Sequence, residues 1–331
     1  MTESTIASVA DIAAAHARLR EVLSGVLVGQ ATPVRLAFVT LLCSAHSLIE
    51  GVPGVGKTLL VRALAACLDV RFGRVQFTPD LLPSDVIGMP VLDPTRGELR
   101  FRSGPLFTDL LLADEINRAA PKVQSALLEA MQERRVTIGN TTYPLPAPFL
   151  VIATQNPVEQ AGTFDLPEAQ LDRFMLLHRL EYLTAEQEKE VLRRNAQLGV
   201  RRDGKGAVAR TEFDVLGEQT TGSSEQLVRA MEDVTQVHVS DAFLEHCVAI
   251  VNRTRKHPKL ALGCSPRAGI SLVKASRARA LIHGRDYVLP EDLYALAEDV
   301  ILHRMRLTYE AVADGFTGPQ VLQEILGESE K

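Results

Sequence analysis

Cysteine is scarce in this chain, and the few cysteines present are not arranged as a site. Only four occur in 331 residues, and none belongs to a C-x-x-C pair: Cys43, Cys67, Cys247 and Cys264. Each has apolar neighbours in the sequence, which is typical of reduced, buried thiols. We therefore expect free thiols in a cytoplasmic protein.

The sequence also lacks the short motifs of several enzyme classes. Its eight histidines are scattered, with no H-E-x-x-H and no other metal-ligand spacing. It has no G-x-S-x-G segment of the kind that carries a serine nucleophile. The sequence therefore indicates neither a metalloprotease nor a serine hydrolase.

Long apolar runs are missing as well. The longest uncharged apolar stretch, Leu36 to Ile49, is shorter than the roughly 20 residues that a membrane-spanning helix needs. It fits a core helix that runs into a strand. The first residues, Met1 to Thr5, lack the basic and apolar segments of an export signal. We expect no membrane insertion.

There is no basic excess. The formal net charge is −5, whereas nucleic-acid-binding domains usually carry a clear positive charge, so nucleic acid is not the expected partner. One basic cluster is more typical of a solvated face than of a nucleic-acid site: Arg201, Arg202, Lys205 and Arg210. With 46% hydrophobic and 23% charged residues, the composition is that of a globular protein long enough for two domains.

One segment carries a complete phosphate-binding pattern, G-x-x-x-x-G-K-[ST]. It reads Gly51-Val52-Pro53-Gly54-Val55-Gly56-Lys57-Thr58. The glycines let backbone N–H groups approach the phosphates of a nucleoside triphosphate, Lys57 can reach the β- and γ-phosphates, and the Thr58 hydroxyl can ligate Mg²⁺. His46 to Glu50 predicts a strand before the loop. Leu59 to Leu68 predicts a helix whose amino terminus faces the anion.

Residues 1–183 alternate between strand and helix signals, which predicts a doubly wound parallel α/β domain. A continuous apolar run predicts a buried strand at Leu110–Ala113. Further strands are predicted at Arg74–Phe77, Phe149–Thr154 and Met175–Leu180. Helices are predicted from Thr32-Pro33, as N-cap and first residue, and from Pro121. Turn residues predict β-hairpins near residues 86–103 and 134–146, the second with a type II′ turn at Gly139-Asn140. The alternative to a functional role for these hairpins is that they are surface features only.

The remainder of the chain favours helices. Residues 184–224 predict a connecting helix over Glu186–Leu198 and then a loop or linker rich in glycine and charge. Residues 225–331 predict a helical domain. In it, Pro290 begins a helix with one apolar face: Leu293, Leu296, Val300 and Ile301.

Two acidic residues follow the strand Leu110–Ala113. Asp114 has the position of a carboxylate that holds Mg²⁺ together with the loop hydroxyl. Glu115 points elsewhere and can orient and deprotonate an attacking water. The alternative is an ordinary acidic loop after a strand.

Three further residues are candidates for contact with the γ-phosphate. Asn156 closes the strand Phe149–Thr154, although Asn-Pro is also a common turn. Arg173, 17 residues later, suits an arginine finger, with a salt bridge to Asp172 or Glu168 as the alternative. Arg267 follows Ser265-Pro266 in the first turn of a predicted helix. A cation in the first turn of a helix is unfavourable next to the helix dipole, and a bound anion there would offset that cost. Arg267 is therefore a candidate phosphate sensor; the alternative is a surface arginine.

Together these segments resemble the AAA+ ATPases, and among them the MoxR family. Gly51–Thr58 resembles Walker A, although Gly56 stands where MoxR sequences often have alanine. Leu111–Arg118 resembles Walker B, Ala153–Pro157 resembles sensor 1, Glu168–Phe174 the finger segment and Gly263–Ala268 sensor 2. The resemblance covers about Leu19 to Leu307.

The resemblance implies a five-stranded parallel sheet of order 5-1-4-3-2, followed by a helical lid. It implies a ring, usually a hexamer, in which Arg173 enters the neighbour's site while Arg267 acts in cis. The two hairpins would match insertions of the helix-2-insert clade, which includes the magnesium-chelatase motor subunit. Gly29-Gln30 would lie near the adenine, and Leu59 would continue the nucleotide-binding segment.

The function implied is Mg²⁺-dependent ATP hydrolysis that drives chaperone-like remodelling, maturation or activation of protein complexes. The partners implied are a protein client and a von Willebrand factor A domain protein. Three alternatives stay open: a metal-chelatase motor subunit, a slow nucleotide-gated binding module, and a DNA-acting ring.

Overall fold

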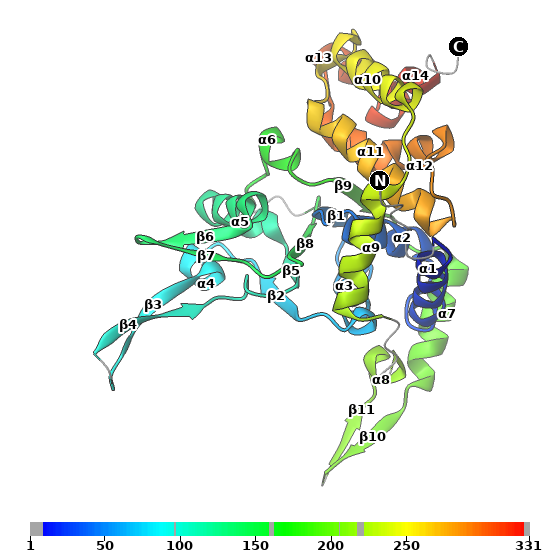
Figure 1. Ribbon diagram of the computed structural model, residues 1–331. Helices are drawn as coiled ribbons and strands as arrows, with labels where there is room; N and C mark the ends of the chain where they lie inside the picture. Colours follow the sequence, from blue (N-terminus) through cyan, green and yellow to red (C-terminus); the bar gives the residue numbers. More distant parts are fainter. Residues whose placement is uncertain (1–8, 96, 159–161, 205, 217–221, 328–331) are drawn as a thin grey trace, which may run out of the picture.

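The core of the molecule is a five-stranded parallel sheet. The computed structural model describes residues 9–95, 97–158, 162–204, 206–216 and 222–327. Its central sheet has the order β2-β5-β8-β1-β9, which confirms the predicted order when the five strands are counted along the chain. The strands are β1 (Ser47–Gly51), β2 (Phe72–Gln76), β5 (Leu110–Asp114), β8 (Leu150–Gln155) and β9 (Leu176–Leu180) (Figure 1).

The register of the central strands decides where the connecting segments lie. In β1 and β9, Ser47 pairs with Leu176 and Gly51 with Leu180. In β1 and β8, Glu50 pairs with Gln155. The segments that follow β1, β5 and β8 therefore share the carboxyl edge of the sheet. The segment that precedes β9 lies at the opposite, amino edge, about 13 Å away along a five-residue strand.

Both faces of the sheet are covered, which explains the continuous apolar strands. Leu110 and Leu112 of β5 pack into one buried cluster, and Leu111 and Ala113 into the other. The first cluster includes α1 (Val9–Ser24), α2 (Ala31–Leu42) and α3 (Lys57–Leu68). The second includes α4 (Pro83–Ile87) and α5 (Pro121–Glu133). A strand buried on both faces needs no polar residue in alternate positions.

The start of α2 differs from its prediction. The helix begins at Ala31 with Gln30 as its N-cap, and the Val34 N–H donates to the Gln30 carbonyl. Pro33 therefore lies inside the first turn instead of opening the helix. The first turn tolerates proline because its N–H groups have no helical acceptor.

Two hairpins project from the sheet domain on the same side (Figure 1). The first is formed by β3 (Gly88–Asp93) and β4 (Glu98–Ser103), and the second by β6 (Arg135–Ile138) and β7 (Thr141–Pro144). Gly139 has a φ of +60°, as the predicted tight turn requires. Both hairpins are present where the turn residues predicted them.

The segment 199–224 is not the simple loop that its composition suggested. After α7 (Ala185–Gln197) the chain forms an antiparallel hairpin of β10 (Val200–Asp203) and β11 (Gly206–Ala209), and then α8 (Glu212–Leu216). Asp203 pairs with Gly206, and Gly204 has a φ of +56°. The prediction of a loop or linker rested only on the glycine and charge content of this segment. Lys205 of the basic cluster lies outside the described residues.

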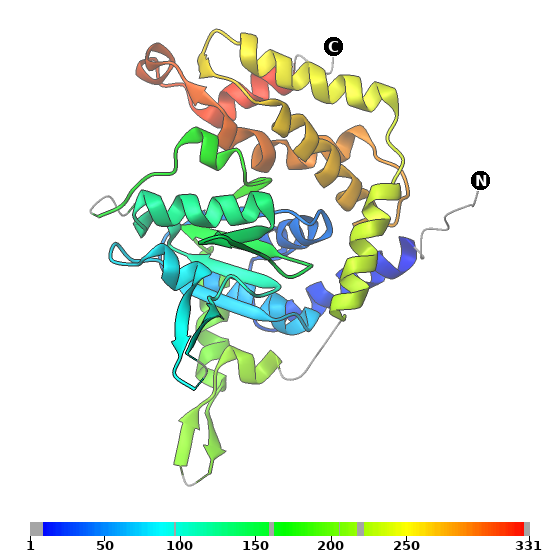
Figure 2. The same ribbon diagram turned by 60° about the vertical axis from the view of Figure 1, so that its left-hand side comes forward.

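A helical lid lies above the sheet domain in both views (Figures 1 and 2). Its helices are α9 (Ser224–Gln236), α10 (Asp241–Lys256), α11 (Pro266–Ile282), α12 (Pro290–Ile301), α13 (Tyr309–Ala313) and α14 (Gly318–Gly327). Short elements complete the fold: η1 (Ile116–Arg118), α6 (Glu168–Leu171), η2 (Leu302–Arg304), β12 (Leu260–Leu262) and β13 (Arg306–Leu307).

The predicted apolar face of α12 is fully buried, at Leu293, Leu296, Val300 and Ile301. The division into domains at residues 183 and 225 stays a prediction. No helix within the described ranges has both the length and the apolar character needed to cross a membrane.

A buried histidine ties the sheet to α5. His46 precedes β1, its Nδ1 accepts a hydrogen bond from the Val151 N–H (3.0 Å), and its Nε2 lies 3.2 Å from the Met131 carbonyl. Both contacts require a neutral ring that carries its proton on Nε2. Burial lowers the pKa of His46 to about 4.

We expect the free energy of unfolding to fall as the pH decreases from about 6.5 towards about 4, because the unfolded chain then binds a proton that folded His46 excludes. Urea unfolding across this pH range, in the wild type and in His46→Gln, measures the effect. The variant should show a shallower pH dependence. Equal slopes for the two proteins would contradict the assignment.

Candidate functional site

The predicted phosphate loop joins β1 to α3 at the carboxyl edge of the sheet. Gly51 ends the strand and Lys57 begins the helix, with Gly56 as its N-cap. Gly54 and Gly56 both have a φ of +86°, a region that residues with a Cβ rarely adopt. The left-handed turns leave α3 with its first N–H groups directed at the loop, an arrangement that suits an anion.

Lys57 lies under the loop that precedes it. Its ammonium donates to the Gly51 carbonyl and, at 3.3 Å, to the Val52 carbonyl. Burial lowers the pKa of Lys57, while the nearby carboxylate of Asp114 opposes the shift. The ammonium is thus held at the loop by neutral acceptors that phosphate oxygens could replace.

Thr58 and Asp114 meet as the sequence predicted. The Thr58 hydroxyl donates to Asp114 Oδ2 at 3.1 Å, across the 55 residues that separate them in the chain. A hydroxyl and a carboxylate beside a phosphate-binding loop are oxygen ligands of the kind that Mg²⁺ prefers, with the remaining positions left for phosphate and water. The residues therefore fit a magnesium ion.

The same carboxylate carries two interactions that sequence reasoning missed. Arg74 of β2 forms an ion pair with Asp114 Oδ2 at 2.8 Å. Thr154 of β8, fully buried, donates to Asp114 Oδ1 at 2.6 Å and accepts from the Glu115 N–H at 2.9 Å. Thr154 thereby fixes the side chain of Asp114 and the backbone of Glu115. Because β2, β5 and β8 are neighbours, strand order would have indicated both contacts.

Glu115 leaves the strand in a strained conformation. Its φ of +59° and ψ of +50° are left-handed, which costs about 1–2 kcal/mol for a residue other than glycine. Its carboxylate accepts from Gln76 Nε2 at 2.7 Å and pairs with Arg118 at 3.2 Å. The turn separates the two acids, so that Asp114 faces the loop hydroxyl while Glu115 is held by a second set of partners.

Asn156 follows β8 at the same edge. The side chain is buried at 5% exposure, and its Oδ1 accepts from the Val158 N–H at 3.2 Å. Since Glu50 pairs with Gln155, Asn156 lies level with Gly51, the first residue of the loop. The structure thus brings five predicted positions to one edge: the loop, Thr58, Asp114, Glu115 and Asn156.

Arg173 lies elsewhere. It precedes β9 and so lies at the amino edge, away from the phosphate loop of its own chain. The salt bridges considered as alternatives for Arg173 are not formed, because Asp172 pairs with Arg304 (2.8 Å) and Glu168 with Arg306 (2.6 Å). Its Nε is buried with no hydrogen-bond partner among the described residues.

Arg267 lies beside the same segment. It is in the first turn of α11 as predicted, with Ser265 as the N-cap, and its guanidinium faces Asp172 at 3.7 Å. The anion near this helix end is thus the Asp172 carboxylate, which also accepts from the Ser265 hydroxyl at 2.8 Å. The placement at the amino edge argues against the role in cis, which required Arg267 to reach the phosphates of its own chain.

The comparisons with known proteins agree with this geometry. The ATPase family associated with various cellular activities matches residues 46–176, and the AAA lid domain matches residues 252–325. The chain is 43% identical to the uncharacterised protein YeaC of Bacillus subtilis, over 92% of this chain and 91% of that protein. It is also 43% identical to the chaperone MoxR1 of Mycobacterium tuberculosis, over 91% of this chain and 78% of that protein.

The chain belongs to the MoxR family of AAA+ ATPases. A crystal structure of a candidate ATPase from Cytophaga hutchinsonii supports the assignment of fold. It superposes with a TM-score of 0.83 at 40% sequence identity, covering 96% of this chain and 95% of that one.

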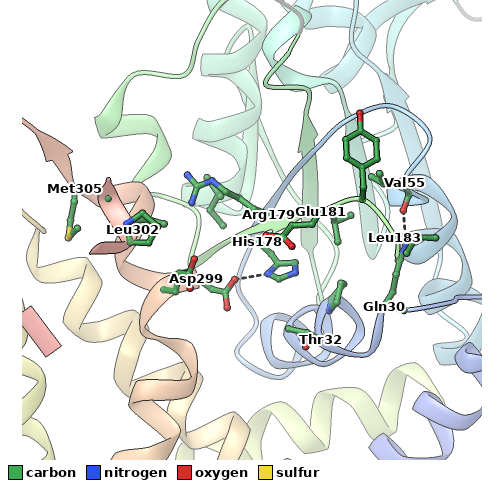
Figure 3. Close-up of a pocket in the computed structure, with 18 of the residues that line it drawn as sticks. Gln30, Thr32, Val55, His178, Arg179, Glu181, Leu183, Asp299, Leu302 and Met305 are labelled. Atoms are coloured by element: carbon green, nitrogen blue, oxygen red, sulfur yellow. Dashed lines mark hydrogen bonds and ion pairs between the residues drawn. The ribbon is translucent and has the colours of Figure 1, made fainter. Parts of the chain in front are cut away.

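Two cavities of this MoxR-family chain adjoin the phosphate loop. The larger, about 1230 Å³, lies between β9, the start of α2 and the lid (Figure 3). It touches the loop only at Val55, and the pair His178–Asp299 (2.6 Å) crosses it. The smaller, about 550 Å³, is lined by three loop residues, Gly54, Val55 and Gly56, together with Leu59, Gln30, the apolar segment 26–28 and mostly polar residues of α7. The smaller cavity better suits a nucleotide base, because it adjoins three residues of the phosphate loop and has an apolar wall at residues 26–28.

Gln30 connects both cavities to the loop. Its Nε2 donates to the Val55 carbonyl at 2.6 Å, as drawn in Figure 3, and its Oε1 is buried without a partner in the described part of the chain. Gly29 has a φ of +72° and packs against Gln187 of α7. Gln30 therefore lies at the loop and lines both cavities, while Gly29 lines the larger one.

We expect Thr154→Val to weaken Mg²⁺-dependent ATP binding by about 10- to 100-fold, because Asp114 would lose the bond that orients it. Calorimetric titration with ATP, with and without Mg²⁺, measures the change, and Thr154→Ser should restore binding. Thr40→Val is the matched control, since Thr40 is equally buried but bonds only the Leu36 carbonyl within α2. An unchanged affinity in Thr154→Val would contradict the proposed role of Thr154.

Proposed function

We propose that this protein hydrolyses ATP with Mg²⁺ and uses the energy to remodel protein complexes. The observation that carries the proposal is the contact between Thr58 and Asp114 beside the phosphate loop, with Glu115 one residue further on. An ordinary anion site would need the loop alone. The paired hydroxyl and carboxylate add a metal position, and the second acid adds a base.

Each residue at the carboxyl edge has a distinct task in this proposal. Lys57 exchanges its carbonyl partners for the β- and γ-phosphates. Thr58 and Asp114 hold the metal, which when bound would neutralise charge on the phosphates. Glu115 accepts a proton from the attacking water, and Asn156 orients that water or the γ-phosphate. The smaller cavity beside Gln30 holds the adenine.

Arg118 and Gln76 restrain Glu115 in the described structure. The Glu115 carboxylate accepts from Gln76 and pairs with Arg118, so an attacking water can reach it only by replacing one of these partners. We propose that Glu115 exchanges one of these partners for water when nucleotide is in place.

The transition-state charge is stabilised from a second subunit. Arg173 and Arg267 lie together at the amino edge and are not placed to reach the nucleotide of their own chain. We propose that both enter the site of the neighbour in a ring of six subunits. A finger of this kind contributes roughly 10³–10⁵ in rate, or about 4–7 kcal/mol.

The wider role is proposed from relatives. One of them is described as a chaperone, MoxR1 of Mycobacterium tuberculosis, which supports a protein client and a remodelling task. A von Willebrand factor A domain protein is the proposed partner. A cytoplasmic location is supported by the four cysteines, which are all buried free thiols.

Two variants test the reaction. Lys57→Ala should lose ATP binding, because the Lys57 ammonium is the charge that the loop holds where the phosphates would bind. Glu115→Gln should bind ATP with nearly unchanged affinity and lose about 10²-fold or more in turnover, because the amide cannot accept the proton. Calorimetry measures the binding and phosphate release the turnover. Normal turnover in Glu115→Gln would remove Glu115 from the role of base.

The shared site has its own test. Arg173→Ala and Glu115→Gln should each be inactive alone and regain phosphate release when mixed, because one subunit supplies the base and its neighbour the finger. Arg267→Ala mixed with Glu115→Gln should behave in the same way. If activity does not return in mixed assemblies, the arginines do not act between subunits.

A further inference from the structure

One arginine of the lid is buried against the finger segment. Arg304 ends η2, directly after α12, and its side chain is only 2% exposed. Burial lowers its pKa, and the Asp172 carboxylate opposes that shift. A guanidinium removed from water in this way needs nearly all of its donors satisfied.

Three hydrogen bonds of Arg304 go to the backbone around Arg173, while others go to the Val300 carbonyl and the Ser271 hydroxyl within the lid. Nη2 donates to the Phe174 carbonyl at 2.7 Å and to the Asp172 carbonyl at 3.3 Å, and Nη1 donates to the Met175 carbonyl at 3.2 Å. The carbonyls on both sides of Arg173 are therefore held by one side chain of the lid. The planar fork of a guanidinium can do this, whereas a lysine ammonium cannot.

Asp172 completes the contact. Its Oδ1 accepts from Arg304 Nε at 2.8 Å, and its Oδ2 accepts from the Ser265 hydroxyl at 2.8 Å. Ser265 is the N-cap of α11, the helix that carries Arg267. We call Arg304, Asp172 and Ser265 the lid clasp.

The finger has little else to place it. The described structure gives the Arg173 guanidinium no carboxylate partner, and its Nε has no acceptor. Its direction is therefore set mainly by the backbone of residues 172–175, which the lid clasp holds. Met175 then joins the sheet through its N–H, which donates to the His46 carbonyl at 2.8 Å.

We propose that Arg304 and Asp172 are positioning residues, through which the lid of one subunit sets the reach of Arg173 into the neighbouring site. The inference rests on the proposed function, in which Arg173 acts between subunits. A movement of the lid relative to β9 displaces the clasp and the finger together. The lid of one subunit thereby controls hydrolysis in the next.

The test uses Arg304→Lys and Asp172→Asn in the full-length protein. Each should lower kcat for ATP by about 10²-fold, the loss expected for a displacement of about 1 Å, while the Kd for ATP stays within twofold of wild type. Arg306→Ala is the matched control. It removes an exposed side-chain ion pair between the lid and Glu168 and leaves the backbone bond from the Asp172 N–H to the Glu168 carbonyl in place, so kcat should not change.

Mixing the clasp variants with Glu115→Gln subunits distinguishes a misplaced Arg173 from a general loss of structure. Arg304→Lys and Asp172→Asn keep an intact base, so mixing either with Glu115→Gln should restore phosphate release, because the Glu115→Gln subunit supplies a correctly held finger. If Arg304→Lys does not fold, as judged by its thermal unfolding, Asp172→Asn decides the matter, since it keeps the buried guanidinium and one acceptor.

Two outcomes overturn the inference. One is a kcat within twofold of wild type in a folded clasp variant. The other is a loss that mixing does not reverse although Arg173→Ala mixed with Glu115→Gln does recover. If Arg173→Ala itself fails to recover, the finger between subunits is wrong, and the proposed function fails at that step.

Discussion

The in-register pairing of β1 with β8 and β9 is the constraint on which the rest of the structure depends. It brings Gly51, Asp114 and Asn156 to one edge of the sheet and leaves Arg173 at the other. The phosphate loop and the acids can then act on one nucleotide without any long-range adjustment. Arg173 on the far edge lies away from this nucleotide site, so the division between edges favours the proposed shared site.

Hydrogen bonds between strands refine this arrangement. Thr154 on β8 and Arg74 on β2 reach the Asp114 carboxylate from either side of β5. Three neighbouring strands thus hold the Asp114 carboxylate, which is the proposed metal ligand. Orientation of a ligand by partners that do not touch the metal is a general property of metal sites.

Much of this molecule was predictable from its sequence. The loop Gly51–Thr58, the acids after an apolar strand, the two hairpins and the apolar face of α12 each follow from local patterns, and the sheet order followed from the family resemblance. The hairpin β10–β11 was missed because only the composition of this segment was considered, and a high content of glycine and charge does not distinguish a loop from a short exposed hairpin.

The clasp of Arg304 and the contacts of Arg267 could not be predicted, because they join segments more than 90 residues apart across the boundary between sheet and lid. No local pattern specifies how two such parts dock. A helix start identifies the first turn that carries Arg267, but it does not tell which edge of the sheet that turn will face.

The bonds from Lys57 to the Gly51 and Val52 carbonyls have a consequence for ligand capture. They let the lysine brace its own loop in the absence of phosphate. The phosphate loop then loses its conformational entropy during folding and not when a ligand binds. Capture of a triphosphate becomes an exchange of acceptors around an ammonium that is already in position, which favours rapid and reversible loading.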